Sequence, residues 1–148
     1  MDSKTLNVLK GQARKDLLSF CVYTDKFFEV NKHHVTIAEE LQAFMEGKTK
    51  RLILQTPPRS GKSRLVGEAI AWSMGAMNRR DVIYAGHSIN LLEGFSRNIR
   101  GRVESMEFRS LFPNVKIKEG NAAINDWATT NDNRLMIYGV GGGITGKG

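Results

Sequence analysis

The feature that most constrains this chain is residues 56–63, which read Thr-Pro-Pro-Arg-Ser-Gly-Lys-Ser. An apolar stretch, Leu52-Ile53-Leu54, precedes them, and apolar residues at helical spacing follow from residue 65 onward. A strand, a tight loop and an amphipathic helix are the context in which a Gly-Lys-Ser loop binds phosphate. The pattern therefore predicts a phosphate-binding loop between a strand and a helix.

The residue types of this loop suit a nucleoside triphosphate. The amides of Ser60, Gly61, Lys62 and Ser63 are expected to point into one concavity at a helix N-terminus, where partial positive charge favours an anion. Lys62 would reach the β- and γ-phosphates, and the Ser63 hydroxyl would complete the shell of a Mg²⁺ ion. Thr56 replaces the usual first glycine, and the two prolines after it carry no N–H, so the anion-binding amides must come from the C-terminal half of the loop.

Composition limits the class of protein. The chain has 148 residues and is 41% hydrophobic, which predicts one domain with a real core. No apolar run approaches the roughly 20 residues of a membrane span, and the first residues lack the pattern of a signal peptide, so we expect a protein of the cytoplasm. The single cysteine, Cys21, excludes an internal disulfide and a cysteine-based zinc site and is expected to be buried. The expected metal is Mg²⁺ arriving with nucleotide.

The charge balance favours a polyanionic partner. There are 22 basic and 15 acidic residues, a net charge of +7. Arg97, Arg100, Arg102 and Arg109 lie close together in the sequence, and helical spacing turns Arg97 and Arg100 away from the core. The cluster is either an ordinary solvated surface or a contact with DNA phosphates or a neighbouring subunit.

Along the chain, residues 1–50 are predicted to form a helical lead-in and residues 51–148 a nucleotide-binding core. One or two helices are expected within residues 6–28, and another from an N-cap at Thr36 to a stop at Gly47. His33 and His34 come before that helix. They either have a structural role or serve as ligands, as a base or as a contact to adenine. Gln55 is also a candidate for the adenine contact by its position.

The second half of the chain has a strand and helix pattern. Residues 81–85 read as a buried parallel strand, followed by a helix capped by Asn90. Residues 116–128 and 134–140 read as a hairpin around the polar turn at 131–133. Together with the loop, these elements predict an α/β fold with a mostly parallel sheet.

Three segments together resemble a known family. They are the Pro-Pro-Arg-Ser-Gly-Lys-Ser loop at 57–63, the Tyr-Ala-Gly-His-Ser segment at 84–88 with Phe-Ser-Arg-Asn-Ile-Arg at 95–100, and the glycine-rich segment at 139–148 with Gly-Ile-Thr-Gly. In order and spacing they resemble the ATPase half of tailed-phage terminase large subunits, over nearly the whole chain. The resemblance implies a P-loop NTPase fold of the additional-strand, RecA-like type.

The resemblance also implies an activity and partners. Members of this family use ATP to move double-stranded DNA into a capsid, and a second domain is a metal-dependent nuclease. Carried over, Lys62 and Ser63 would bind phosphate and Mg²⁺, and Arg59 would stabilise charge on the γ-phosphate during transfer. The implied partners are double-stranded DNA, a terminase small subunit, a portal and further copies of the chain, in the cytoplasm of a bacterial host.

One departure from the family pattern bears on activity. The family places an acidic strand soon after the Gly-Ile-Thr-Gly segment, and this sequence reaches Gly148 first, so we expect an N-terminal fragment without the nuclease domain that binds nucleotide but hydrolyses little. Two other interpretations stay open from the residues alone. One is a helicase-like, nucleic-acid-dependent ATPase, and the other is a non-catalytic nucleotide- or DNA-binding module.

Overall fold

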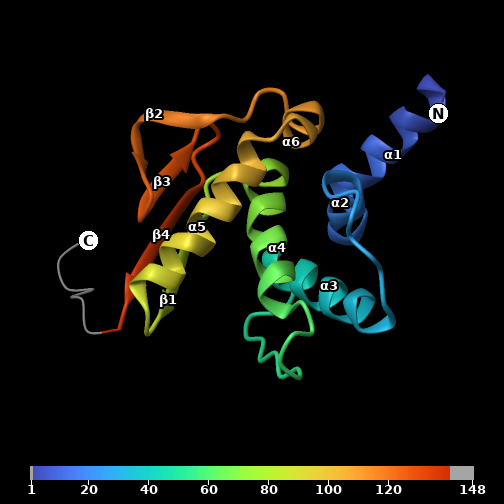
Figure 1. The fold of residues 1–148 in the computed structure, drawn as a ribbon. Coiled ribbons are helices and arrows are strands. Elements are labelled where there is room, and N and C mark those ends of the chain that lie inside the picture. The colour runs from blue at the N-terminus through green and yellow to red at the C-terminus, as the bar shows by residue number, and fades with distance from the viewer. Residues whose placement is uncertain (1, 141–148) are drawn as a thin grey trace.

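A computed structural model describes residues 2–140 of the chain (Figure 1). Its helices are α1 (Ser3–Lys15), α2 (Leu17–Thr24), α3 (Lys32–Met45), α4 (Lys62–Ala76), α5 (Ile89–Glu104) and α6 (Met106–Leu111). Its strands are β1 (Asp81–Gly86), β2 (Ile117–Ala123), β3 (Asp126–Thr129) and β4 (Arg134–Gly139). The glycine-rich end at 141–148, including Thr145, lies outside the described residues.

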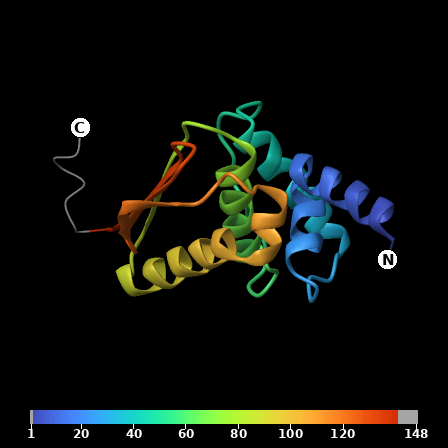
Figure 2. The ribbon, with the colours of Figure 1, turned by 90° about the horizontal axis from the view of Figure 1, so that it is seen from above.

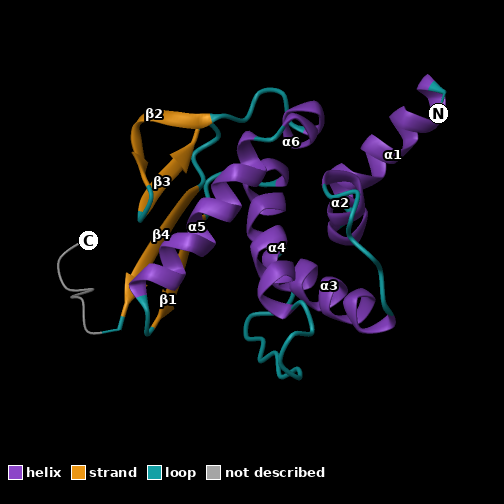
Figure 3. Cartoon of the chain, in the orientation of Figure 1, coloured by secondary structure: helices purple, strands orange, loops and turns teal. Residues whose placement is uncertain are grey.

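The helices are arranged on either side of α4. Helices α1, α2 and α3 pack on one side of it, and α5 packs on the other side and along the sheet (Figures 1 and 2). The colouring by secondary structure separates the four-stranded sheet from the helical N-terminal part (Figure 3). Helix α4 therefore connects the two parts of the molecule, and the predicted phosphate-binding loop precedes it directly.

The sheet is mixed, so the prediction of an α/β fold is confirmed but that of a mostly parallel sheet is wrong. Its strand order is β1-β4-β3-β2. Within residues 2–140, only β1 and β4 pair in parallel, with Asp81 opposite Arg134 and Gly86 opposite Gly139. The pairs β2–β3 and β3–β4 are antiparallel. Short turns join these neighbours, and a short turn can only connect antiparallel strands. The predicted hairpin around 131–133 is present, and residues 116–128 fold into a further hairpin of their own.

The apolar stretch before the loop is not a strand. Residues 51–57 have no assigned secondary structure, although Leu52 and Leu54 pack against the core. Ile53 between them is 84% exposed. Strand β1 was predicted to be buried, but it lies at the edge of the sheet with alternating exposure, and Ile83 is 61% exposed. An apolar run becomes a strand only where a neighbour takes its backbone hydrogen bonds, and within residues 2–140 this run has none.

Two helices begin earlier than predicted. Helix α3 starts after Asn31 rather than at Thr36, and α5 starts after Ser88 rather than Asn90. The Asn31 N–H donates to Nδ1 of His34 over 3.2 Å, and the Ser88 hydroxyl accepts from the Leu91 N–H over 3.4 Å. The Asn31 carbonyl also accepts the His34 N–H over 2.9 Å, so each earlier residue takes up an amide of the first turn and the later cap is not needed. Helices α1, α2 and α4 follow the predicted pattern, whereas α6 was not predicted from the sequence.

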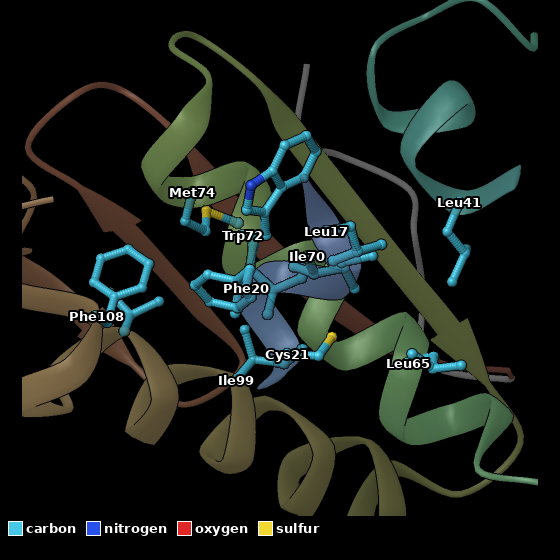
Figure 4. Close-up of a cluster of buried hydrophobic side chains, with 14 of the residues drawn as sticks. Leu17, Phe20, Cys21, Leu41, Leu65, Ile70, Trp72, Met74, Ile99 and Phe108 are labelled. Carbon is cyan, nitrogen blue, oxygen red and sulfur yellow. The ribbon is translucent and has the colours of Figure 1, made fainter. Parts of the chain in front are cut away.

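The core lies where α2, α4, α5 and α6 meet (Figure 4). Phe20 and Phe108 are fully buried and meet edge to face, with ring centroids 6.3 Å apart. Trp127 from the sheet is also fully buried, and its indole N–H donates to the Ser96 hydroxyl over 2.9 Å. Cys21 is buried among these residues as predicted, and desolvation raises the pKa of its thiol, which keeps it in the neutral form.

Candidate phosphate-binding site

The C-terminal half of the loop forms the start of α4. Gly61 is the N-cap residue, in the left-handed region at φ +78°, and Lys62 is the first residue of the helix. The Leu65 N–H donates to the Gly61 carbonyl over 3.0 Å and closes the first turn. The amides before Leu65 therefore have no acceptor within the helix. Unpaired amides at a helix N-terminus attract anions; Lys62 and Ser63 were predicted to carry them, and Arg64 was not.

The N-terminal half of the loop is held by a bond across it. The Ser60 hydroxyl donates to the Thr56 hydroxyl over 2.7 Å. Arg59, between the prolines and Ser60, has φ +62°, a left-handed conformation that is rare for a residue with a side chain. Thr56 therefore supplies a hydrogen bond where the usual motif has a glycine, and the left-handed residue of this half is Arg59 instead.

Residues 56–64 line a concavity of about 400 Å³. It contains the side chains of Arg59 and Lys62 together with Ser60 and Ser63, all four of which were predicted as site residues. Arg64 adds a third cation, and no Asp or Glu is among the lining residues. The concavity is thus a cluster of positive charge and amides built from one continuous segment, and it matches a polyphosphate in charge.

A second concavity lies between the loop and the start of α3. It measures about 320 Å³ and shares Arg59, Ser60, Gly61 and Arg64 with the first. Its α3 side includes His33 and His34, whose rings are 4.1 Å apart. His33 Nε2 lies 3.1 Å from the carbonyl oxygen of Ser60. The histidines were predicted to precede the helix, but they are in its first turn, directly against the loop.

An ion-pair network begins at Arg64, the residue directly after the loop in the sequence. Arg64 hydrogen-bonds the carboxylate of Asp25, and Arg102 lies 3.5 Å from the same carboxylate. The Arg102 guanidinium also donates to both carboxylate oxygens of Glu68, with contacts of 2.8 to 3.1 Å, and to the carbonyl of Thr24 over 2.7 Å. Burial acts to lower the pKa of Arg102, but the hydrogen bonds and charge of Glu68 and the charge of Asp25 raise it, so the guanidinium stays charged.

The arginines considered for DNA or subunit contact are in different environments. Arg97 is exposed, with its guanidinium 3.5 Å from Glu93. Arg100 donates to the carbonyl of Ala122 and lies 3.4 Å from Glu104. Arg102 is partly buried and is held in the network with Glu68 and Asp25, so its guanidinium is already paired. Of these three side chains, Arg97 is the one that projects into solvent.

The sequence pattern did not reveal that Arg64, Glu68, Arg102 and Asp25 belong together. Arg64 and Glu68 are spaced by one turn on α4, which is a visible signal, but Asp25 follows α2 and Arg102 lies on α5. Among the described residues no group of three or more His, Cys, Asp or Glu could hold a metal ion. The residue predicted to meet Mg²⁺, Ser63, is exposed in the first turn of α4.

Comparison of this chain with protein-family models, with curated proteins and with solved structures gave no match. Within residues 2–140, no helix is long and apolar enough to cross a membrane.

Proposed function

We propose that this chain binds the phosphates of ATP, with Mg²⁺, in the concavity lined by residues 56–64. The observation that carries the proposal is that Gly61 begins α4 in a left-handed conformation with Lys62 immediately after it, so that free amides and a lysine converge on one cavity. This arrangement combines the two attractions that phosphate-binding loops use, backbone N–H donors and a mobile ammonium group. The Ser63 hydroxyl is the candidate ligand for Mg²⁺.

The resemblance extends this proposal from binding to a biological role. We assign the chain to the ATPase part of a terminase-type motor, with a P-loop NTPase fold, that moves double-stranded DNA into a capsid. The support is the order of the three motif segments in the sequence, two of which lie at the loop before α4 and at the end of β1 leading into α5. Small subunit, portal and further copies of the chain are the partners of the same proposal, which places it in the cytoplasm of a bacterial host.

One observation favours nucleotide binding with little turnover. Hydrolysis of ATP needs a group that orients the attacking water, and the concavity around Lys62 has no carboxylate among its lining residues. Arg59 could stabilise charge on a transferring phosphoryl group, but it cannot accept a proton from water. The described residues therefore fit a non-catalytic nucleotide-binding module better than a helicase-like ATPase that acts alone.

The experiment is equilibrium binding of a fluorescent ATP analogue, with and without Mg²⁺, to the wild-type chain and to Lys62→Ala. A hydrogen bond to a charged group contributes about 1.5–3 kcal/mol, so Lys62→Ala should weaken binding by about 10- to 150-fold. The matched control is Lys118→Ala on β2, where the lysine is exposed and 3.7 Å from Asp132. This control should bind the analogue like the wild type.

The same samples are then assayed for release of phosphate. We expect background turnover in all three proteins because of the missing carboxylate. Equal affinity of Lys62→Ala and the wild type would refute binding at this loop. Turnover in the wild type that Lys62→Ala abolishes would refute the assignment as a non-catalytic module. It would favour the alternative assignment as a helicase-like ATPase.

A further inference from the structure

We propose that His33 is a positioning residue of the phosphate-binding loop, which holds the loop backbone in its anion-binding form from outside the motif. That the loop binds a nucleotide rests on the proposed function, but the contact of His33 with the loop does not. His33 lies in the first turn of α3, and 27 residues separate it from the Ser60 carbonyl that its Nε2 contacts over 3.1 Å. The contact joins a separate helix to the middle of the loop.

The loop needs such support because its backbone is strained. Arg59 is in the left-handed region at φ +62°, and a non-glycine residue stays there only where its surroundings fix it. The bond between the hydroxyls of Ser60 and Thr56 fixes the loop from within. The bond from His33 reaches the residue directly after Arg59 and fixes it from the side of α3.

The contact also sets the direction of an anion-binding amide. The Ser60 carbonyl and the Gly61 N–H belong to one planar trans peptide unit, so they point in opposite directions. By drawing the Ser60 carbonyl toward α3, His33 turns the Gly61 N–H away from α3. Since Gly61 is the residue that begins α4, this amide is one of the donors available to a phosphate.

The neighbouring histidine holds His33 in place and limits what fits at Gly61. The rings of His33 and His34 are 4.1 Å apart, and His34 lies 5.3 Å from the ring of Phe28. A Cβ atom on Gly61 would come within 3.2 Å of His34 Nε2, so the loop backbone packs closely on this ring. Nδ1 of His34 in turn accepts the Asn31 N–H over 3.2 Å, which ties the pair to the start of α3.

Substitutions of His33 can distinguish a role as hydrogen-bond donor from a role in packing. A carbonyl oxygen can only accept, so His33 Nε2 must carry the proton. Gln at this position keeps an N–H donor on a side chain of similar length, whereas Phe keeps a ring and loses the donor. His33 is exposed, and none of these substitutions removes core contacts. The matched control is His87→Ala, another exposed histidine, in the loop between β1 and α5.

The first readout needs no nucleotide. Amide hydrogen exchange of Leu65, whose N–H donates to the Gly61 carbonyl and closes the first turn of α4, should be faster in His33→Phe and His33→Ala than in the wild type, because the loop then opens more often. His33→Gln and His87→Ala should exchange like the wild type. A long-range ¹H–¹⁵N spectrum of the imidazoles should show His33 protonated at Nε2. If exchange in His33→Phe equals that of the wild type, or Nε2 carries no proton, the proposal is overturned.

The second readout is affinity for the fluorescent Mg²⁺–ATP analogue. A net hydrogen bond of ordinary strength corresponds to about 2- to 12-fold in affinity, which His33→Phe should lose and His33→Gln should largely retain. If Lys62→Ala weakens binding but His33→Phe does not, the role of His33 is refuted while the proposed function stands. If the wild type binds no nucleotide, the proposed function fails, and hydrogen exchange still decides whether His33 positions the loop.

Discussion

At the scale of single residues, the end of α4 opposite the phosphate-binding loop depends on Asn133. Its side chain is fully buried. Nδ2 donates to the carbonyls of Met74 and Met77 over 2.9 and 2.7 Å, and Oδ1 accepts the N–H of Arg80 over 2.9 Å. The last carbonyls of a helix have no partners within it, so this amide takes the place of a C-terminal cap.

We expect Asn133→Ala to lower the free energy of unfolding by about 1–3 kcal/mol, because the Arg80 N–H loses its acceptor inside the protein. Urea unfolding followed by far-UV circular dichroism measures the change. The control is Asn78→Ala, an exposed asparagine just after α4, which should stay within about 0.5 kcal/mol of the wild type. Equal effects of the two substitutions would show that α4 does not depend on the buried amide.

Residues of the loop could be predicted from the sequence because their roles follow from local spacing. Gly61 and Lys62 stand side by side, and the start of the helix brings their backbone together. His33 and Asn133 could not be found in this way, because their partners are 27 to 59 residues distant in the sequence. Nothing in their own neighbourhood indicates those partners. The arginines at 97, 100 and 102 share a helix, but only their tertiary contacts separate the exposed Arg97 from the partly buried Arg100 and Arg102.

At the scale of elements, α4 and the end of α6 approach closely at Gly75. A Cβ atom on Gly75 would lie 2.3 to 2.6 Å from ring atoms of Phe112, which is closer than real contacts allow. Gly75→Ala should therefore lower the free energy of unfolding by about 1–3 kcal/mol through overpacking. Gly94→Ala on α5 is the matched control, because nothing lies within 4 Å of its added Cβ. It should instead raise the free energy of unfolding by about 0.5–1 kcal/mol.

A double-mutant cycle tests that the cost at Gly75 comes from Phe112. Phe112→Leu removes the ring, so Gly75→Ala combined with Phe112→Leu should cost less than the sum of the two single changes. Chemical unfolding of the four proteins gives the coupling energy. Additive effects would show that the cost of Gly75→Ala does not come from the Phe112 ring.

Helical periodicity predicted the described helices except α6, but it placed the starts of α3 and α5 too late. Asn31 and Ser88 begin α3 and α5, although Thr36 and Asn90 are also good capping residues. A sequence contains several residues that could cap a helix, and the N-cap is the one at the position where the helical backbone begins. The stretch at 52–54 shows the same limit for strands, since an apolar run carries no information about which strand will pair with it.

At the scale of the whole molecule, the sequence indicated a mixture of helices and strands but not the direction of strand pairing. Alternating strands and helices favour parallel pairing, and among the described strands only β1 and β4 pair in that way. The hairpins that make the rest of the sheet antiparallel depend on short turns, one of which, at 124–125, was not recognised. Helices α2, α4 and α5 also had to be assembled before the network of Asp25, Arg64, Glu68 and Arg102 became visible.

This network makes the packing of the N-terminal helices on α4 and α5 sensitive to acid. Asp25 follows α2, and its carboxylate meets Arg64 of α4 and Arg102 of α5. Burial acts to raise the pKa of Asp25, but the N–H of Phe27, 3.0 Å away, and the two guanidinium groups outweigh it, so the pKa is lowered. The unfolded chain, with an ordinary pKa of about 3.9, then binds a proton more readily than the folded chain.

The stabilisation from Asp25 is therefore fully present above the pKa of the unfolded chain and is lost as the pH falls through the lower pKa of the folded protein. We expect Asp25→Asn to be less stable than the wild type at pH 7, and the difference in the free energy of unfolding to shrink as the pH is lowered from about 5 toward 3. Urea unfolding at intervals across this range measures it. Asp132→Asn, whose carboxylate is exposed beside Lys118, should differ little from the wild type at any of these pH values. A difference for Asp25→Asn that stays constant, or grows in acid, would show that its charge does not hold the two parts of the molecule together.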